Sequence, residues 1–221
     1  MVFSIALIHP TARVVPILSD VARQVMPGVE IVNIVDEGIP YLIYHAGGLS
    51  GQVVTRICSY ARNAEEAGAE AIVLASAMFG DALDAAKATV AVPVVRIDAA
   101  MAEKAVQFGS SIGVISTQQF IMDATLSLLR ERAESLGREV AIEPRLCEDA
   151  GFAFEKDDFE AYDYIVGNAA ARLKNNDIII LADIMMTRVV HAVSERMHMP
   201  VLASPKIAFE DLAKKLSYFR R

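Results

Sequence analysis

The chain has 221 residues, of which 54% are hydrophobic and 22% are charged, and its formal net charge is −7. A negative chain lacks the basic surface that binds nucleic-acid phosphates, and no apolar run reaches the about 18 residues of a membrane span. We therefore expect neither a nucleic-acid-binding nor a membrane protein. The start of the sequence lacks the basic region of a signal peptide, which predicts a cytoplasmic protein.

Strand-like apolar runs alternate with helical periodicities along the whole chain. The first part predicts strands at 2–8, 30–35, 71–75 and 92–97, and helices at 12–26, 49–67 and 81–89. The second part predicts strands at 111–115, 139–143, 178–182 and 200–203, and helices at 120–136, 159–174, 187–197 and 206–217. Because such alternation is typical of parallel sheets with right-handed crossovers, we predict an α/β fold.

The sequence also repeats itself. A shift of 107 positions, which carries Ser4 to Ser111, aligns three blocks without a gap: 4–8 with 111–115, 72–76 with 179–183, and 93–95 with 200–202. The repeat predicts two pseudo-symmetric Rossmann-like halves, each with a parallel sheet flanked by helices and with a cleft between them. We expect one half to comprise 1–97 plus 205–221 and the other 98–204, with the last helix packing back on the first half.

The ends of four predicted strands are the expected ligand site. In open parallel α/β sheets, ligands bind beyond the carboxyl ends of the strands. This rule selects 9–11, 76–78, 116–117 and 183–185. Helix N-termini at these places would offer backbone N–H donors, which suit a carboxylate or phosphate.

Several stretches resemble the aspartate/glutamate/hydantoin racemase superfamily, and its hydantoin-racemase-like branch most. They are 69–76, 93–102, 177–182 and Ser204-Pro205, so that the resemblance covers nearly the whole chain. The resemblance implies no cofactor, a homo-oligomer, and a substrate held between two cysteines that remove and return a proton on opposite faces of a carbon acid.

The sequence departs from the family at both of those cysteines. The first falls on Ser76, and the second on or beside Asp183. Cys58 lies within a predicted helix and Cys147 lies beyond the predicted strand 139–143, so we expect neither to replace them. In a reducing compartment we also expect these two cysteines not to form a disulfide.

Ser76 and Asp183 can do different chemistry. An unassisted serine hydroxyl is too weak a base, so we predict that Ser76 donates a hydrogen bond. The carboxyl of Asp183 has an ordinary pKa of about 3.9, and burial would raise it toward the range of a useful general base. The backbone amides of Ala77, Met78 and Ile184 are the expected further donors to a substrate.

Each of these residues also has a structural interpretation. Asp183 and Thr117 could each be a helix N-cap, whereas the family resemblance places Thr117 against a substrate carboxylate. His9 could contact substrate or act as an acid, or it could be a satisfied turn residue.

The segment 36–48 resembles the family's mobile loop over the cleft. It contains Tyr41, Tyr44 and His45, for which aromatic packing is the alternative to a functional role. The methionines Met78, Met185 and Met186 could line an apolar side of the pocket, and at least one of them is expected to be ordinary core.

These residues predict a cofactor-independent, metal-independent isomerase-type enzyme that acts on a small carboxylate-bearing carbon acid. Two alternatives stay open. One is a non-catalytic small-molecule binding protein that kept the cleft and lost the chemistry. The other is a decarboxylase-like relative in which Asp183 donates a proton after the loss of carbon dioxide.

Overall fold

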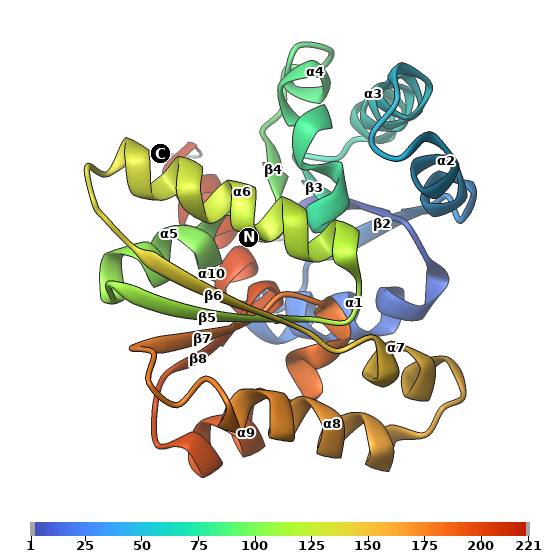
Figure 1. Ribbon diagram of the computed structural model, residues 1–221. Coiled ribbons are helices and arrows are strands. Elements are labelled where there is room, and N and C mark those ends of the chain that lie inside the picture. Colours follow the sequence, from blue (N-terminus) through green and yellow to red (C-terminus); the bar gives the residue numbers. More distant parts are fainter. Residues whose placement is uncertain (1–2, 220–221) are drawn as a thin grey trace. The chain divides into compact units, whose positions relative to one another are not determined.

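The computed structural model describes residues 3–219 and divides them into two compact units (Figure 1). Unit 1 consists of 3–97 and 205–219, and unit 2 of 98–204. Four residues of the predicted first half lie outside the described residues: Met1, Val2, Arg220 and Arg221. Val2 is also the first residue of the first predicted strand.

Unit 1 is built on a parallel four-stranded sheet in the order β2-β1-β3-β4. Its strands are β1 (Ser4–His9), β2 (Glu30–Val35), β3 (Ala71–Leu74) and β4 (Val94–Arg96). Its helices are η1 (Ala12–Val14), α1 (Val15–Val25), α2 (Gly38–Ala46), α3 (Gly51–Glu66), η2 (Ala77–Ala82), α4 (Leu83–Lys87) and α10 (Ser204–Phe219). β3 is buried along its whole length, as expected of a central parallel strand whose residues are all apolar.

Unit 2 has the same sheet, in the order β6-β5-β7-β8. Its strands are β5 (Ser111–Ser116), β6 (Ala141–Leu146), β7 (Ile178–Leu181) and β8 (Val201–Ala203). Its helices are α5 (Ala99–Phe108), α6 (Gln119–Ser135), α7 (Glu148–Glu155), α8 (Phe159–Ala171), η3 (Ile184–Val189) and α9 (Val190–Met197). α5 packs on α6, β7 and β8, whereas α8 packs on β5 and α9 on β8.

The sequence repeat is a repeat of structure. β1 and β5 begin at Ser4 and Ser111, and β3 and β7 at Ala71 and Ile178, which are both separations of 107. A hydrogen bond at the first residue of β1 and of β5 is repeated as well. The Ser4 N–H donates to Glu70 Oε2 and the Ser111 N–H donates to Asp177 Oδ2, each at 2.9 Å. The predicted α/β fold with two similar halves, each with a parallel sheet flanked by helices, is therefore confirmed.

The prediction did not contain helix α7, and two further segments differ from it. β6 extends to Leu146 and not to 143, because it is an edge strand and accommodates Pro144 without losing a ladder bond to a neighbour on that side. The segment 36–48 forms helix α2 and not a loop. The Asp36 carboxylate accepts the Gly38 N–H at its start (2.9 Å), and Gly47 ends it in the left-handed region with φ of 68°.

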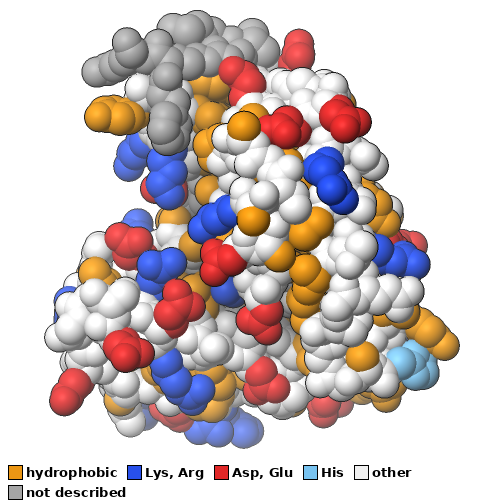
Figure 2. All heavy atoms as spheres, turned by 90° about the horizontal axis from the view of Figure 1, so that it is seen from above, with side chains coloured by type: hydrophobic (Ala, Val, Ile, Leu, Met, Phe, Trp, Pro, Cys, Tyr) orange, Lys and Arg blue, Asp and Glu red, His pale blue; other side chains and the backbone are white. Residues whose placement is uncertain are grey.

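Two further features of the structure concern the surface charges and the helices. Acidic and basic side chains are interspersed on the face drawn in Figure 2. Within residues 3–219, no helix combines the length and the apolar character that crossing a bilayer requires.

Candidate functional site

The carboxyl end of β7 in unit 2 holds a buried carboxylate, Asp183, which is 1% exposed. Its Oδ2 accepts the Thr117 N–H at 2.6 Å, a bond that reaches from the end of β7 to the end of the neighbouring β5. The Ser116 hydroxyl lies 3.3 Å from its Oδ1 and 3.0 Å from the carbonyl of Gln118, so that one proton serves two acceptors. The ionised form of Asp183 is thus stabilised mainly by one short hydrogen bond, from the Thr117 N–H.

Burial changes the acidity of this carboxyl. It raises the pKa of Asp183 to about 6, against the hydrogen bonds with Thr117 and Ser116, which act to lower it. Asp183 is therefore mostly ionised at neutral pH, but it is a stronger base than an exposed aspartate.

The N-cap alternatives have different outcomes for the two residues. Asp183 occupies the N-cap position of η3, but its side chain makes no capping hydrogen bond. Gln118, and not Thr117, is the N-cap of α6. The Thr117 hydroxyl is buried near Asp183 and acts to lower its pKa, but it meets the geometry of no hydrogen bond.

Unit 2 also contains Cys147, which the sequence analysis set aside, and Tyr162, which it did not consider. Cys147 directly follows β6, and its N–H donates to the Ser116 carbonyl at 2.8 Å. Tyr162 on α8 is fully buried, and its hydroxyl has no hydrogen-bond partner. The charge of Asp183 acts on both, because after burial it is the next largest cause that raises the pKa of each.

Cys147 takes a place like that of Asp36 in unit 1, but the 107-residue repeat does not reveal it. In unit 1, the Asp36 N–H donates to the His9 carbonyl at 3.1 Å, and Asp36 follows β2 as Cys147 follows β6. Because β2 and β6 are 111 positions apart, the shift of 107 ends the second strand at 142 and leaves Cys147 beyond its carboxyl end.

In unit 1, the position equivalent to Asp183 is a capping serine. Ser76 is buried and its Oγ accepts the Met78 N–H at 3.3 Å, which caps η2. The Met78 amide, a predicted donor to substrate, is thus already used within the chain. The Ser76 hydroxyl proton is not used by this bond, because Oγ is the acceptor.

His9 ends β1 in the same unit and is fully buried. Its Nε2 lies 2.8 Å from Asn33 Oδ1, while its Nδ1 is buried without a partner. Burial lowers the pKa of His9, against the hydrogen bond with Asn33, which raises it. The imidazole is therefore neutral at neutral pH.

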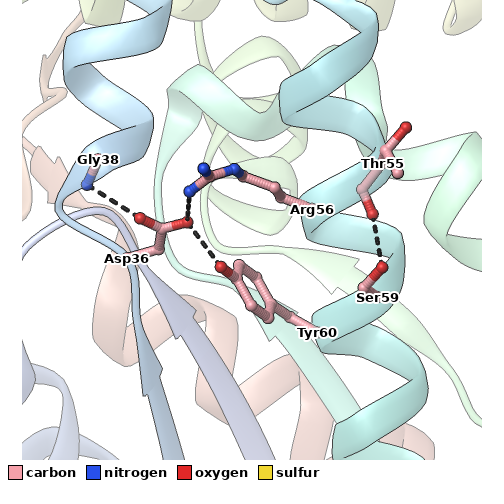
Figure 3. Close-up of polar contacts among 6 residues, drawn as sticks. All are labelled: Asp36, Gly38, Thr55, Arg56, Ser59 and Tyr60. Carbon is pink, nitrogen blue, oxygen red and sulfur yellow. Dashed lines mark hydrogen bonds and ion pairs between the residues drawn. The ribbon is translucent and has the colours of Figure 1, made fainter.

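The end of β2 carries a structural ion pair (Figure 3). Asp36 Oδ2 accepts from Arg56 Nη1 at 2.8 Å and from the Tyr60 hydroxyl at 2.6 Å, and Oδ1 accepts the Gly38 N–H. Burial acts to raise the pKa of Asp36, but the hydrogen bonds from Tyr60, Arg56 and Gly38 together lower it. This carboxylate joins α2 to α3 and is fully occupied in doing so.

The remaining predicted residues lie close to these strand ends. Ala77 and Ile184 are buried directly after Ser76 and Asp183. Met186 belongs to the core of unit 2, as expected for at least one of the methionines, while Met185 is partly buried against that core and Met78 is partly exposed.

The aromatic residues of α2 are not part of the core of unit 1. Tyr41 and Tyr44 are exposed, and their rings contact His45 of the same helix, with centroid distances of 4.1 and 5.7 Å. The choice between aromatic packing and a functional role for these residues stays open.

The part of the chain that the structure describes contains no set of three or more His, Cys, Asp or Glu side chains placed to hold a metal ion. Cys58, on α3, and Cys147 are both free.

Comparison with known proteins gives one family. The sequence profile of the family described as Asp/Glu/Hydantoin racemase matches residues 6–212. A search of curated protein sequences found no match.

Solved structures with the same fold include enzymes of two kinds. The chain is similar to an allantoin racemase from Klebsiella pneumoniae (18% identity, TM-score 0.71, covering 98% of this chain and 89% of that one). It is similar to a glutamate racemase from Bacillus anthracis (18% identity, TM-score 0.74, covering 98% and 82%). It is also similar to an arylmalonate decarboxylase (16% identity, TM-score 0.67, covering 96% and 91%). At these identities the likeness shows a common fold.

Proposed function

Because the chain belongs to the Asp/Glu/Hydantoin racemase family, we propose that it is a cofactor-independent, isomerase-type enzyme that moves a proton on a small carboxylate-bearing carbon acid. The observation that carries the proposal is the buried carboxylate of Asp183 with its raised pKa. A titratable group with such a shift at the carboxyl edge of a parallel sheet is typical of a functional site.

Asp183 is the general base of the proposed reaction. Its ionised carboxylate takes a proton from the carbon next to the substrate's carbonyl or carboxylate group, and it becomes a neutral acid. A base with a pKa near 6 abstracts a proton more readily than an exposed aspartate, and it is still mostly ionised at pH 7.

Hydrogen-bond donors would stabilise the charge that develops on the substrate oxygen. We assign this role to the Ser76 hydroxyl, whose proton the Met78 bond leaves unused, and to the backbone amides of Ala77 and Ile184. Thr117, with a buried hydroxyl that lacks a partner, is assigned to a substrate carboxylate. His9, which is neutral, is assigned to substrate binding as a hydrogen-bonding group and not as a cation.

The test is proton–deuterium exchange by NMR. The protein is incubated in D2O with amino acids, hydantoins, keto acids and aldonate-type sugar acids. The expected result is exchange at a carbon next to a carbonyl group, which Asp183→Asn lowers by at least about a hundredfold. Asp123→Asn, the same change at an exposed position of α6, is the matched control and should leave the rate unchanged. Undiminished exchange in Asp183→Asn would refute the role of Asp183.

A decarboxylase is the second candidate, and the raised pKa of Asp183 favours it. A carboxyl with a pKa of about 6 is protonated in part of the molecules near neutrality, so it could deliver a proton to the carbanion left by the loss of carbon dioxide. Disubstituted malonates in the same panel distinguish this candidate, because they would lose carbon dioxide. Binding of a panel compound without exchange or carbon dioxide loss would favour the non-catalytic binding protein.

We also propose that the protein is a cytoplasmic homo-oligomer. The two free cysteines are compatible with a reducing compartment, and the family resemblance supports self-association. Size-exclusion chromatography with light scattering would test the second statement, and a monomer at micromolar concentration would refute it.

A further inference from the structure

Three polar groups of unit 2 neither remove nor return a proton in a one-base mechanism. They are the thiol of Cys147 and the hydroxyls of Tyr162 and Thr117. All of them belong to unit 2, so their placement relative to Asp183 does not depend on unit 1.

Backbone contacts tie Cys147 to the same strand end as Asp183. The Cys147 N–H donates to the Ser116 carbonyl at 2.8 Å, and Ser116 contacts Asp183 Oδ1 through its hydroxyl. Helix α7 begins directly after Cys147 and lies over Thr117, since a Cβ added at Gly151 would come within 3.4 Å of Thr117 Cβ. Thr117 is in turn the residue whose N–H binds Asp183.

Two buried hydroxyls of unit 2 have no hydrogen-bond partner. Tyr162 is fully buried and Thr117 is 4% exposed, and neither hydroxyl has a hydrogen-bond partner. Leaving a buried polar atom unpaired costs about 1–3 kcal/mol, a cost that a bound polar ligand would relieve. The charges of Asp183 and Cys147 both act to raise the pKa of Tyr162.

We propose that the Cys147 thiol is the second acid–base group of this site, which returns a proton to the carbon from which Asp183 removes one. This assignment rests on the proposed function. The assignment places one thiol in the site, at the end of β6. The two positions at which the family resemblance leads us to expect cysteines hold Ser76 and Asp183 instead.

The proton transfers balance as follows. The substrate C–H bond breaks, an O–H bond forms on Asp183, and the electron pair stays on the substrate, delocalised onto its carbonyl or carboxylate group. The S–H bond of Cys147 then breaks and a new C–H bond forms, which leaves a thiolate and a protonated Asp183. The reverse reaction, or proton exchange with water, restores the starting forms.

The surroundings of Cys147 keep the thiol protonated at neutral pH, which is the form a proton donor needs. Burial raises the pKa of Cys147 most, and the charge of Asp183 and then that of Asp149 add to the rise. Arg172 and Arg145 act in the opposite direction.

Cys147→Ser, with Cys58→Ser as the matched control, tests the assignment. On a substrate found by exchange, Cys147→Ser should keep deuterium exchange within tenfold, since Asp183 is intact, and should lower product formation at least a hundredfold. Cys58→Ser, on α3 of unit 1, should leave both rates unchanged. Product formation by Cys147→Ser within twofold of the wild-type rate would overturn the assignment while leaving the proposed function standing.

A measurement without substrate tests the role of Cys147 independently of the proposed function. In the Cys58→Ser background, iodoacetamide reacts with Cys147 alone, and the rate at pH 8 reports its thiolate fraction. Adding Asp183→Asn removes the nearby negative charge and should speed alkylation several-fold. An unchanged rate would overturn the assignment, because the two groups would then not share a site. Lack of exchange by the wild-type chain, or undiminished exchange in Asp183→Asn, would instead defeat the proposed function itself.

Discussion

The ends of β3 and β7 occupy the same place in two copies of one fold, yet they carry different chemistry. Ser76 in unit 1 turns its oxygen back to cap its own η2. Asp183 in unit 2 makes no such cap and binds the N–H of Thr117 at the end of the adjacent strand. Because the backbone repeats, the side chain and its neighbours alone decide whether a strand end is a structural cap or a buried acid.

The first prediction, with the largest expected effect, concerns the catalytic role of Asp183. Asp183→Ser makes the end of β7 resemble that of β3, and a serine cannot act as the base. The rate of deuterium exchange should fall by about 10²–10⁴-fold, the usual contribution of a positioned acid or base. The NMR exchange rate on the best panel substrate measures this. A loss of less than tenfold would mean that β7 ends in a residue no more catalytic than Ser76.

The second prediction concerns the pH dependence of stability. A folded-state pKa raised from 3.8 to about 6 means that ionised Asp183 destabilises the fold by up to about 3 kcal/mol. The contribution of Asp183 to stability is fully present below pH 3.8 and is lost as the pH rises through 6. Asp183→Asn should therefore be more stable than the wild type at pH 8 and equal to it at pH 3.5, as measured by urea unfolding.

Asp177, at the opposite end of β7, is the control with the opposite sign. Backbone hydrogen bonds from Ser111 and Ser110 lower the pKa of Asp177, so its contribution is present above its ordinary pKa and is lost as the pH falls. Asp177→Asn should destabilise the protein at pH 8 and have little effect at low pH. Equal pH profiles for the two variants would contradict the difference between the two ends of this strand.

The third prediction compares the central strands β1 and β5. Ala6 in β1 corresponds to Gly113 in β5, where an added Cβ would lie 3.1 Å from Leu173 Cβ and 2.9 Å from its Cδ1. Gly113→Ala should destabilise the protein by about 1–3 kcal/mol through overpacking in a buried strand. The free energy of unfolding measures this. Adding Leu173→Ala should remove the contacts with Cδ1 and Cγ and leave only the one with Cβ, so additive effects in the double variant would contradict the overpacking.

The smallest effect is expected at the cap of unit 1. Ser76→Ala leaves the Met78 N–H without its acceptor and should cost about 1 kcal/mol of stability. Ser76→Thr keeps an acceptor and should restore most of that loss. A Tm of Ser76→Ala equal to that of the wild type would show that the 3.3 Å contact contributes nothing to stability.

Much of the fold could be predicted because its signals are local. A short, continuous apolar run such as Ile178–Leu181 indicates a buried strand in a parallel sheet, and a similar run occurs 107 positions earlier. The end of β6 could not be placed this way, since Pro144 resembles a strand terminator unless the strand is known to lie at an edge. That single error hid Cys147.

The sequence by itself determined two copies of one α/β unit and the position of Asp183 at the end of a buried strand, because periodicity and repetition are properties of the order of residues. Only the tertiary structure decided that Asp183 binds the Thr117 N–H, that the Cys147 N–H binds the Ser116 carbonyl, and that the Tyr162 hydroxyl is unpaired. A pKa depends on burial and on charges brought together from distant parts of the chain, and no local pattern of residues records those distances.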